Sequence, residues 1–228
     1  MLHINKFFGF TLAEVLITLG IIGVVAALTI PNLMTAHKKH KIEAKLTKAV
    51  STINQVIKQS EAENGEMETW DNSLSPVEYL NKYIVPYAKV SQLCEGQGSC
   101  GYPNKFEVHK YINGKYGYYC GIFGFQRVPF ILQDGTLFVW GTKEQSDGTA
   151  DNKNMIIIDI NGSEKPNQFG QDTFFLQRKE EEDAIVPYGA GKSSNELRND
   201  CKKGGEGFYC AELIRENGWK IPSGYPLL

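Results

Sequence analysis

Apolar positions form one unbroken run near the start of this chain, and two periodic patterns follow it. From Phe10 to Leu33 the only charged residue is Glu14. The run is about 20 residues long or slightly more, and as a helix it would span a bilayer core of about 30 Å. The pattern therefore predicts a membrane-spanning segment over residues 10–34 with one carboxylate inside it.

Beyond this run, apolar residues recur at spacings of three and four, which predicts that the helix continues as an amphipathic one. Gly65 is a natural stop for that helix. Pro31 lacks a backbone N–H, so we expect it to kink the helix or melt it locally. The apolar stripe consists of Ile42, Leu46, Ala49, Val50, Ile53 and Ile57.

The pattern after residue 65 predicts a short helix and then a sheet. Ser75-Pro76-Val77-Glu78 is a capping box with proline at the first helical position. From residue 106, short runs of β-branched and aromatic residues alternate with turn pairs such as Asn113-Gly114, which favours an antiparallel sheet. The expected strands cover residues 106–112, 117–123, 128–133, 136–141, 154–160 and 173–177.

The last fifty residues are more polar. Residues 179–207 predict an exposed loop, and residues 208–214 predict a short helix closed by Gly218. The tail behind it carries Trp219 and Tyr225, and loose termini seldom carry such apolar groups. We therefore expect the tail to dock through these two side chains.

Composition narrows the class of protein. The chain has 228 residues, a formal net charge of -2 and a mean hydropathy of -0.30, which excludes a polytopic membrane protein. The charge also argues against nucleic acid as a partner. About 160 residues remain beyond residue 65, enough for one compact domain.

Catalytic signatures are missing from the sequence. No nucleophile elbow, phosphate-binding loop or dinucleotide fingerprint occurs. His3 precedes the apolar run, His37 and His40 follow it on the helix, and alternation predicts His109 on the exposed side of a strand. We therefore do not expect an enzyme.

The five cysteines all follow the apolar run, and none forms a CxxC pair, which weakens zinc and thioredoxin-like interpretations. In an extracytoplasmic domain, Cys94 with Cys100 and Cys201 with Cys210 are candidate disulfides. Cys100 with Cys120 competes with the first pair, because sequence alone does not fix connectivity. Reduced core cysteines are the other interpretation.

The string Gly9-Phe10-Thr11-Leu12-Ala13-Glu14 closely resembles the processing site of prepilins, the precursors of type IV pilins and type II secretion pseudopilins. The resemblance implies that a prepilin peptidase cuts between Gly9 and Phe10 and that the new Phe10 amine is N-methylated. It also implies that Glu14 pairs with the Phe10 amine of a neighbouring subunit. Pro31 lies where many pilins carry a helix-kinking proline.

The family resemblance implies an α+β fold, in which a long N-terminal helix packs on an antiparallel sheet head. Residues 1–9 would be the leader, 10–65 the helix, and 66–228 a globular extracytoplasmic head. The implied partners are the prepilin peptidase and methyltransferase, other pilin subunits, an inner-membrane assembly platform and the lipid bilayer.

One signal disagrees with this topology. The run His37-Lys38-Lys39-His40-Lys41 follows the span, whereas only Lys6 and the amino terminus precede it. The positive-inside rule would place the C-terminal domain in the cytoplasm. The processing site and the cysteines favour export, so we expect an inner-membrane anchor with an exported head.

A loose resemblance to the calcium-binding loop region of major pseudopilins covers Asp159 to Asp172. It implies Asp159, Asn161 and Asp172 as side-chain ligands of calcium. The EF-hand pattern is not matched, and Asn-Gly and Pro-Asn are also ordinary turn pairs.

The sequence thus predicts a structural subunit, a pilin or pseudopilin in a minor role, that assembles through its helix. Whether the filament is a type IV pilus or a type II secretion pseudopilus stays open. A tip subunit binding DNA or glycans, for example through Tyr111 and Tyr116, is an alternative. Another is a membrane-tethered enzyme that uses the leader only for export.

Overall fold

The computed structural model describes residues 9–94, 99–103, 108–117, 127–141 and 155–226. By packing, the chain divides into one unit that ends at Lys41 and a second that begins at Ile42. Helix α1 (Leu12–Asn64) contributes its first part to one unit and its second part to the other. The helix is therefore best described in two pieces.

The first piece of α1 is apolar and uncovered. It contains a window of 18 residues with a mean hydropathy of 2.3, and none of that window is buried. By length and composition it could cross a membrane. The α-helix continues through Pro31, so the local melting that we considered does not occur.

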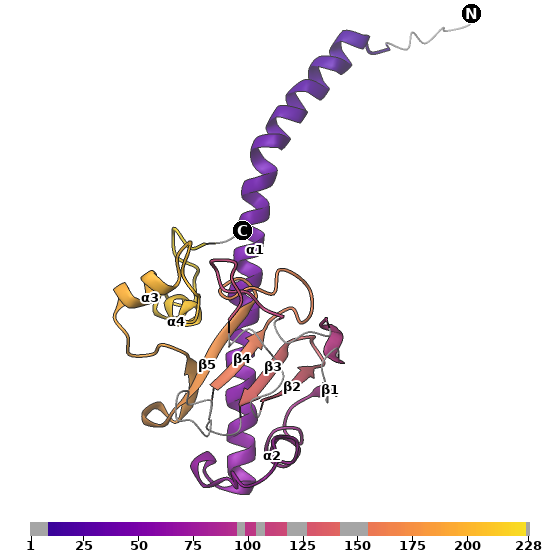
Figure 1. Cartoon of the computed structure of the whole chain (residues 1–228). Helices are drawn as coiled ribbons and strands as arrows, with labels where there is room; N and C mark the ends of the chain where they lie inside the picture. Colours follow the sequence, from indigo (N-terminus) through magenta and orange to yellow (C-terminus); the bar gives the residue numbers. More distant parts are fainter. Residues whose placement is uncertain (1–8, 95–98, 104–107, 118–126, 142–154, 227–228) are drawn as a thin grey trace, which may run out of the picture. The chain divides into compact units, whose positions relative to one another are not determined.

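The second unit is built on a six-stranded antiparallel sheet in the order β1-β2-β3-β4-β5-β6. Each strand pairs with its sequence neighbour, as short connections favour. Figure 1 shows the sheet lying against α1. The strands are β1 (Val90–Leu93), β2 (Arg127–Leu132), β3 (Leu137–Gly141), β4 (Met155–Asp159), β5 (Thr173–Lys179) and β6 (Ala184–Pro187).

Both faces of the sheet are covered. On one face Phe138 and Ile158 pack with the apolar stripe of α1, whose six predicted positions are all buried. On the other face Val139 and Ile157 pack beneath the loop segments that carry Tyr102 and Phe169. Because both faces are covered, all five residues of β3 and of β4 are buried. Strands buried on both faces have nearly continuous apolar sequences.

Asn54 ties α1 to the edge of this sheet. Its side-chain oxygen accepts from the backbone N–H of Ile185 in β6 at 2.8 Å, and its amide donates to the Ile185 carbonyl at 2.8 Å. The side chain thus pairs with an edge strand as a neighbouring strand would. It satisfies two backbone groups that otherwise need partners.

Helix ends follow capping chemistry. Gly65 takes a φ of +80° and its N–H bonds to the Glu61 carbonyl at 3.0 Å, which closes α1 where the sequence predicted. The box at Ser75 and Glu78 forms and opens α2. The remaining helices are α2 (Pro76–Tyr83), α3 (Ser194–Asp200) and α4 (Cys210–Glu216), with 3-10 turns η1 (Met67–Thr69), η2 (Ser99–Gly101) and η4 (Glu180–Glu182).

Several expectations need correction. Residues 179–207 are not one exposed loop, because β6 and α3 lie within them. Strand β1 was not predicted at all. Residues 108–112 form no strand and make one isolated bridge, at Lys110, while the other residues expected as strands before β2 lie mainly outside the described ranges. The expected strands from residue 128 to 177 correspond to β2, β3, β4 and β5.

Candidate functional site

The segment in front of α1 is exposed. Phe10 is 89% exposed, and a Cβ added at Gly9 would meet nothing within 4 Å. The described structure therefore gives no packing reason for a glycine at this position. A requirement for a small residue there would come from another protein, such as a peptidase that must reach the chain.

Glu14 lies in the first turn of α1 and closes a capping box with Thr11. The Thr11 backbone N–H and hydroxyl each donate to Glu14 Oε2 at 2.8 Å, and the Glu14 N–H donates to Thr11 Oγ1 at 3.2 Å. This box satisfies free N–H groups at the helix start. The spacing was visible in the sequence, but we had considered Glu14 only as an intermolecular partner.

The second oxygen of Glu14 is left open. Among the residues that the structure describes, no hydrogen bond or ion pair reaches Oε1. Its surroundings on α1 are exposed apolar side chains, such as Leu12 at 79% and Ile17 at 63%. The carboxylate is therefore held in place by its own chain and still offers an acceptor to a cation from outside.

A second polar site lies at the end of β4. The Asp159 Oδ2 atom accepts from the Tyr102 hydroxyl at 2.9 Å and lies 2.9 Å from His109 Nε2. The donor and acceptor roles in the contact between Nε2 and Oδ2 depend on the tautomer of the His109 ring. Burial, with the nearby Asp159 charge, raises the pKa of the Tyr102 hydroxyl far above its ordinary value.

The prediction for His109 was wrong. Its side chain is fully buried, because the segment that carries it lies over the second face of the sheet and is not a sheet strand. The alternation of inward and outward side chains that holds in a strand does not apply to this segment. A buried histidine needs a partner, and Asp159 supplies one; no partner for His109 Nδ1 is present in the described part of the chain.

The three predicted calcium ligands are close in the chain's fold. Asp159 pairs with Thr173 across the sheet, and the Asn161 N–H donates to Asp159 Oδ1 at 3.2 Å. The Asp172 carboxylate accepts from the N–H groups of Asn167 at 2.9 Å and Gln168 at 2.7 Å. Burial, and then the charge of Asp159, raises the pKa of Asp172 to about 6.

The donor set fits a cation only in part. The side-chain oxygens of Asn161 and Asn167 are buried without a hydrogen-bond partner in the described structure, and they are hard oxygen ligands. Against this, the carboxylates of Asp159 and Asp172 already accept bonds from the protein. No group of three or more His, Cys, Asp or Glu side chains suited to a metal occurs among the described residues. Calcium binding stays a prediction.

Two family models match different parts of the chain. Residues 32–228 match the model described as "Family of unknown function (DUF6613)". The chain belongs to this family. Residues 4–30 match the prokaryotic N-terminal methylation motif, which makes the chain a prepilin of the type IV pilin and pseudopilin kind. No curated protein and no solved structure matches it.

The matched residues 4–30 include Gly9, Phe10 and Glu14, which carry the resemblance drawn from the sequence. Proteins with this motif are typically structural. The motif also implies processing by a prepilin peptidase and assembly with other subunits. With the exposed apolar piece of α1, it fits a membrane-anchored pilin.

The four described cysteines of this prepilin form two disulfides, Cys94 with Cys100 and Cys201 with Cys210, whose Cα atoms lie 5.8 and 5.1 Å apart. Both separations are usual for disulfides. Cys120, the competitor for the first pair, lies outside the described residues.

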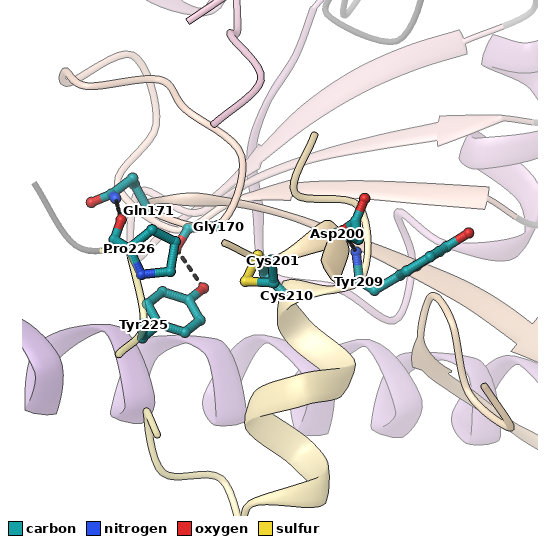
Figure 2. The surroundings of a disulfide bond; sticks show 8 residues. All are labelled: Gly170, Gln171, Asp200, Cys201, Tyr209, Cys210, Tyr225 and Pro226. Carbon is teal, nitrogen blue, oxygen red and sulfur yellow. Dashed lines mark hydrogen bonds between the residues drawn. A yellow bond between two sulfur atoms is a disulfide. The ribbon is translucent and has the colours of Figure 1, made fainter. Parts of the chain in front are cut away.

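The second disulfide lies beside the docked C-terminal tail, as Figure 2 shows. The Tyr225 hydroxyl donates to the Gly170 carbonyl, and a Cβ at Gly170 would lie 2.7 Å from Cys210 Sγ. Gln171 donates to the Pro226 carbonyl. The tail packs through Tyr225 and partly buried Trp219, as expected.

Proposed function

We propose that this prepilin is a filament subunit that assembles through the first piece of α1. Cleavage between Gly9 and Phe10 creates an amine that is then methylated. Glu14 of one subunit accepts that amine from the next. The observation that carries the proposal is the open Oε1 atom of Glu14 on an apolar, uncovered helix.

The magnitudes support this role. A carboxylate at the centre of a membrane helix costs about 2.5–3.5 kcal/mol on insertion scales, and this is an upper bound for Glu14, which lies near the start of the span. Two opposite charges about 4 Å apart attract by about 4 kcal/mol at an effective dielectric constant near 20. Because the two terms are comparable, pairing in a filament offsets the penalty that an unpaired Glu14 carries in lipid.

The remaining roles follow from this assembly. Residues 1–9 serve as a leader, residues 10–65 as the helix, and residues 66–228 as a head outside the cytoplasm. The partners are the prepilin peptidase and methyltransferase, other subunits and an inner-membrane platform. The large head favours a minor subunit, of either a type IV pilus or a secretion pseudopilus. A reporter fused after Leu228 should be active only outside the cytoplasm.

Glu14→Ala and Glu14→Gln test the pairing. Mass spectrometry should find both variants trimmed to Phe10 and methylated like the wild type. Sheared filaments should contain at least about tenfold less of either variant, since one charge pair of about 4 kcal/mol is lost. Glu164→Gln changes the net charge equally on the exposed surface of the head and should assemble normally. Normal incorporation of Glu14→Gln would remove the pairing role.

We also propose that the loop at Asp159 binds calcium. The supporting observation is the pair of buried, unpaired oxygens on Asn161 and Asn167 beside two carboxylates. These two oxygens, with Asp159 and Asp172, would hold the ion, whose charge would stabilise the paired carboxylates. Asn167 is not in the ligand set that the resemblance to major pseudopilins implies.

Thermal unfolding of the full chain in calcium and in EDTA tests this site. Calcium should raise the Tm of the wild type by several degrees, because a ligand that binds only the folded state stabilises it. The rise should shrink in Asn161→Ala, and in Asp172→Ala, which also loses turn hydrogen bonds. An equal Tm for the wild type in calcium and EDTA would exclude the site. Magnesium serves as the control cation.

A further inference from the structure

A groove of about 530 Å³ lies beside the packed piece of α1. One wall is formed by polar side chains that recur along α1 at spacings of four, three and four, which places them on one face of the helix. These side chains belong to Lys48, Thr52, Gln55 and Gln59. The proposed filament and calcium roles use none of them.

The opposite wall comes from the segment before β1 and from the turn after β2. It carries Lys89 and Gln133, and the Gln133 N–H donates to the Lys89 carbonyl at 2.9 Å, which joins the two segments. Val56 and Leu132 also line the groove, and they are only 4% and 7% exposed. The groove therefore has an apolar base between two polar walls.

Tyr87 contributes an aromatic side chain to the groove. Its hydroxyl donates to Glu63 Oε2 at 2.8 Å and accepts from Asn64 Nδ2 at 2.9 Å. Because both bonds lead to the end of α1, they hold the tyrosine ring in place. A side chain that is already ordered loses little conformational entropy when a ligand packs against it.

Most polar side chains of the two walls are not used by the fold. Within the part of the chain that the structure describes, no hydrogen bond or ion pair reaches the side chains of Thr52, Gln59, Lys89 and Gln133. Gln55 uses only its amide nitrogen, in a long bond of 3.4 Å. A carboxamide or a hydroxyl can both donate and accept, so the walls offer a ligand both kinds of partner.

We propose that this groove binds a short oligosaccharide. Sugar hydroxyls donate and accept, which matches the carboxamides of the walls and the Thr52 hydroxyl. The C–H faces of a sugar ring are apolar, which matches the Tyr87 ring and the base of the groove. The volume lies within the range of about 300–1,000 Å³ that small-molecule sites have. The proposal holds whether or not Glu14 pairs in a filament.

The chemistry of the walls favours a sugar over a nucleic acid or a peptide. Lys48 is paired with Asp134 at 2.7 Å, so among the described lining residues Lys89 is the only cation without a partner. A nucleic acid strand is held by several cations. An extended peptide binds mainly to the main chain of a strand edge. In this groove the unused polar groups belong to side chains.

Saccharide binding by the full chain tests the groove. The protein is reconstituted in phospholipid nanodiscs, because many detergents carry sugar headgroups, and is applied to a printed glycan array. Isothermal titration calorimetry then measures the affinity for the saccharide that is retained most strongly. The variant Q55A/Q59A/Q133A should bind that saccharide at least about tenfold more weakly, at about fivefold for each hydrogen bond lost. Thr52→Val, which removes one hydroxyl, should lose about fivefold.

A matched control separates the groove from carboxamides elsewhere on the head. The variant N72A/N81A/N195A removes three exposed carboxamides that do not line the groove, and it should bind the saccharide like the wild type. Thermal melts of both triple variants check that the head remains folded. Retention of no saccharide above empty nanodiscs, or equal losses in both triple variants, would overturn the proposal.

Filament incorporation gives a separate outcome. If the groove instead receives a segment of a neighbouring subunit, Q55A/Q59A/Q133A assembles poorly and the wild type retains no saccharide. That result would refute the sugar site and leave the filament role standing. Conversely, normal assembly of Glu14→Gln would refute the pairing role and leave the saccharide measurement unaffected.

Discussion

The two pieces of α1 differ in where their apolar surface goes. Before Lys41, large side chains such as Val15 and Leu12 are 41% and 79% exposed. From Ile42 onward, the side chains of the apolar stripe on the same helix are at most 8% exposed. Both pieces are α-helical, so burial is what separates them. The fold of one chain accounts for the second piece only, and the first piece needs a bilayer or other subunits.

Two glutamates on this helix show the same difference. Glu43 is 7% exposed and accepts from the Ile221 N–H at 2.9 Å and from Lys220 at 3.0 Å. Glu14 is exposed and is bonded to Thr11 alone among the described residues. One carboxylate is satisfied by distant parts of its own chain. The other keeps an open oxygen, as an intermolecular contact requires.

The strongest test of this contrast is a matched pair of leucine truncations. Leu46→Ala should lower the free energy of unfolding of the head by about 2–5 kcal/mol, because Leu46 is fully buried. Leu19→Ala, at a position 59% exposed, should leave it unchanged. Near-UV circular dichroism of the full chain in detergent and urea measures both. A similar loss in the two variants would break the division of α1 into two pieces.

A smaller effect is expected from the bond between α1 and β6. Asn54→Ala removes the partner of the Ile185 N–H and carbonyl, and because a hydrogen bond contributes about 0.5–1.5 kcal/mol net, the loss of both should cost about 1–3 kcal/mol. The same unfolding measurement applies. Gln55→Ala, at the next and exposed position, should have little effect. Equal stability of Asn54→Ala and wild type would mean that water replaces the amide at this edge.

The smallest effect should come from surface charge on the packed piece. Lys48 lies 2.7 Å from Asp134, with side chains 63% and 34% exposed. Burial alone would raise the pKa of Asp134, but hydrogen bonds from Lys48 and Thr136 lower it. Lys48→Gln should change unfolding free energy by at most about 1 kcal/mol, and less in high salt. A loss as large as that of Leu46→Ala would show that charge, and not burial, docks α1.

The sequence predicted the parts whose signal is local. The stripe from Ile42 to Ile57, the stop at Gly65 and the box at Ser75 and Glu78 all depend on spacing within a few residues. Central strands such as β3 and β4 also carried a dense apolar signal. The α+β class followed from these elements, and the methylation motif depended on a short contiguous string.

The predictions that were wrong or absent depended on tertiary contacts, or on a sequence motif that we did not use. His109 was assigned to solvent because nothing local revealed the loops that cover the second face of the sheet. Strand β6 is short and follows the acidic run of η4, so its own sequence gives little strand signal. Its pairing with β5 makes it a strand. Helix α3 was a different case, since its capping box at Ser193 and Glu196 was present in the sequence. The side-chain oxygens of Asn161 and Asn167 became candidate ligands only because the structure shows that they are buried.

The Glu43 contact bears on how a subunit would respond to tension. Ile42 and Glu43 are where the packed piece of the helix starts, and Ile221 belongs to the last docked segment of the chain. A force applied along the helix therefore acts directly on the final residues of the head through Glu43. It also acts on β6, at the edge of the sheet, through the Asn54 hydrogen bonds. Because the load enters at several points at once, we expect such a head to resist peeling and to yield as one body.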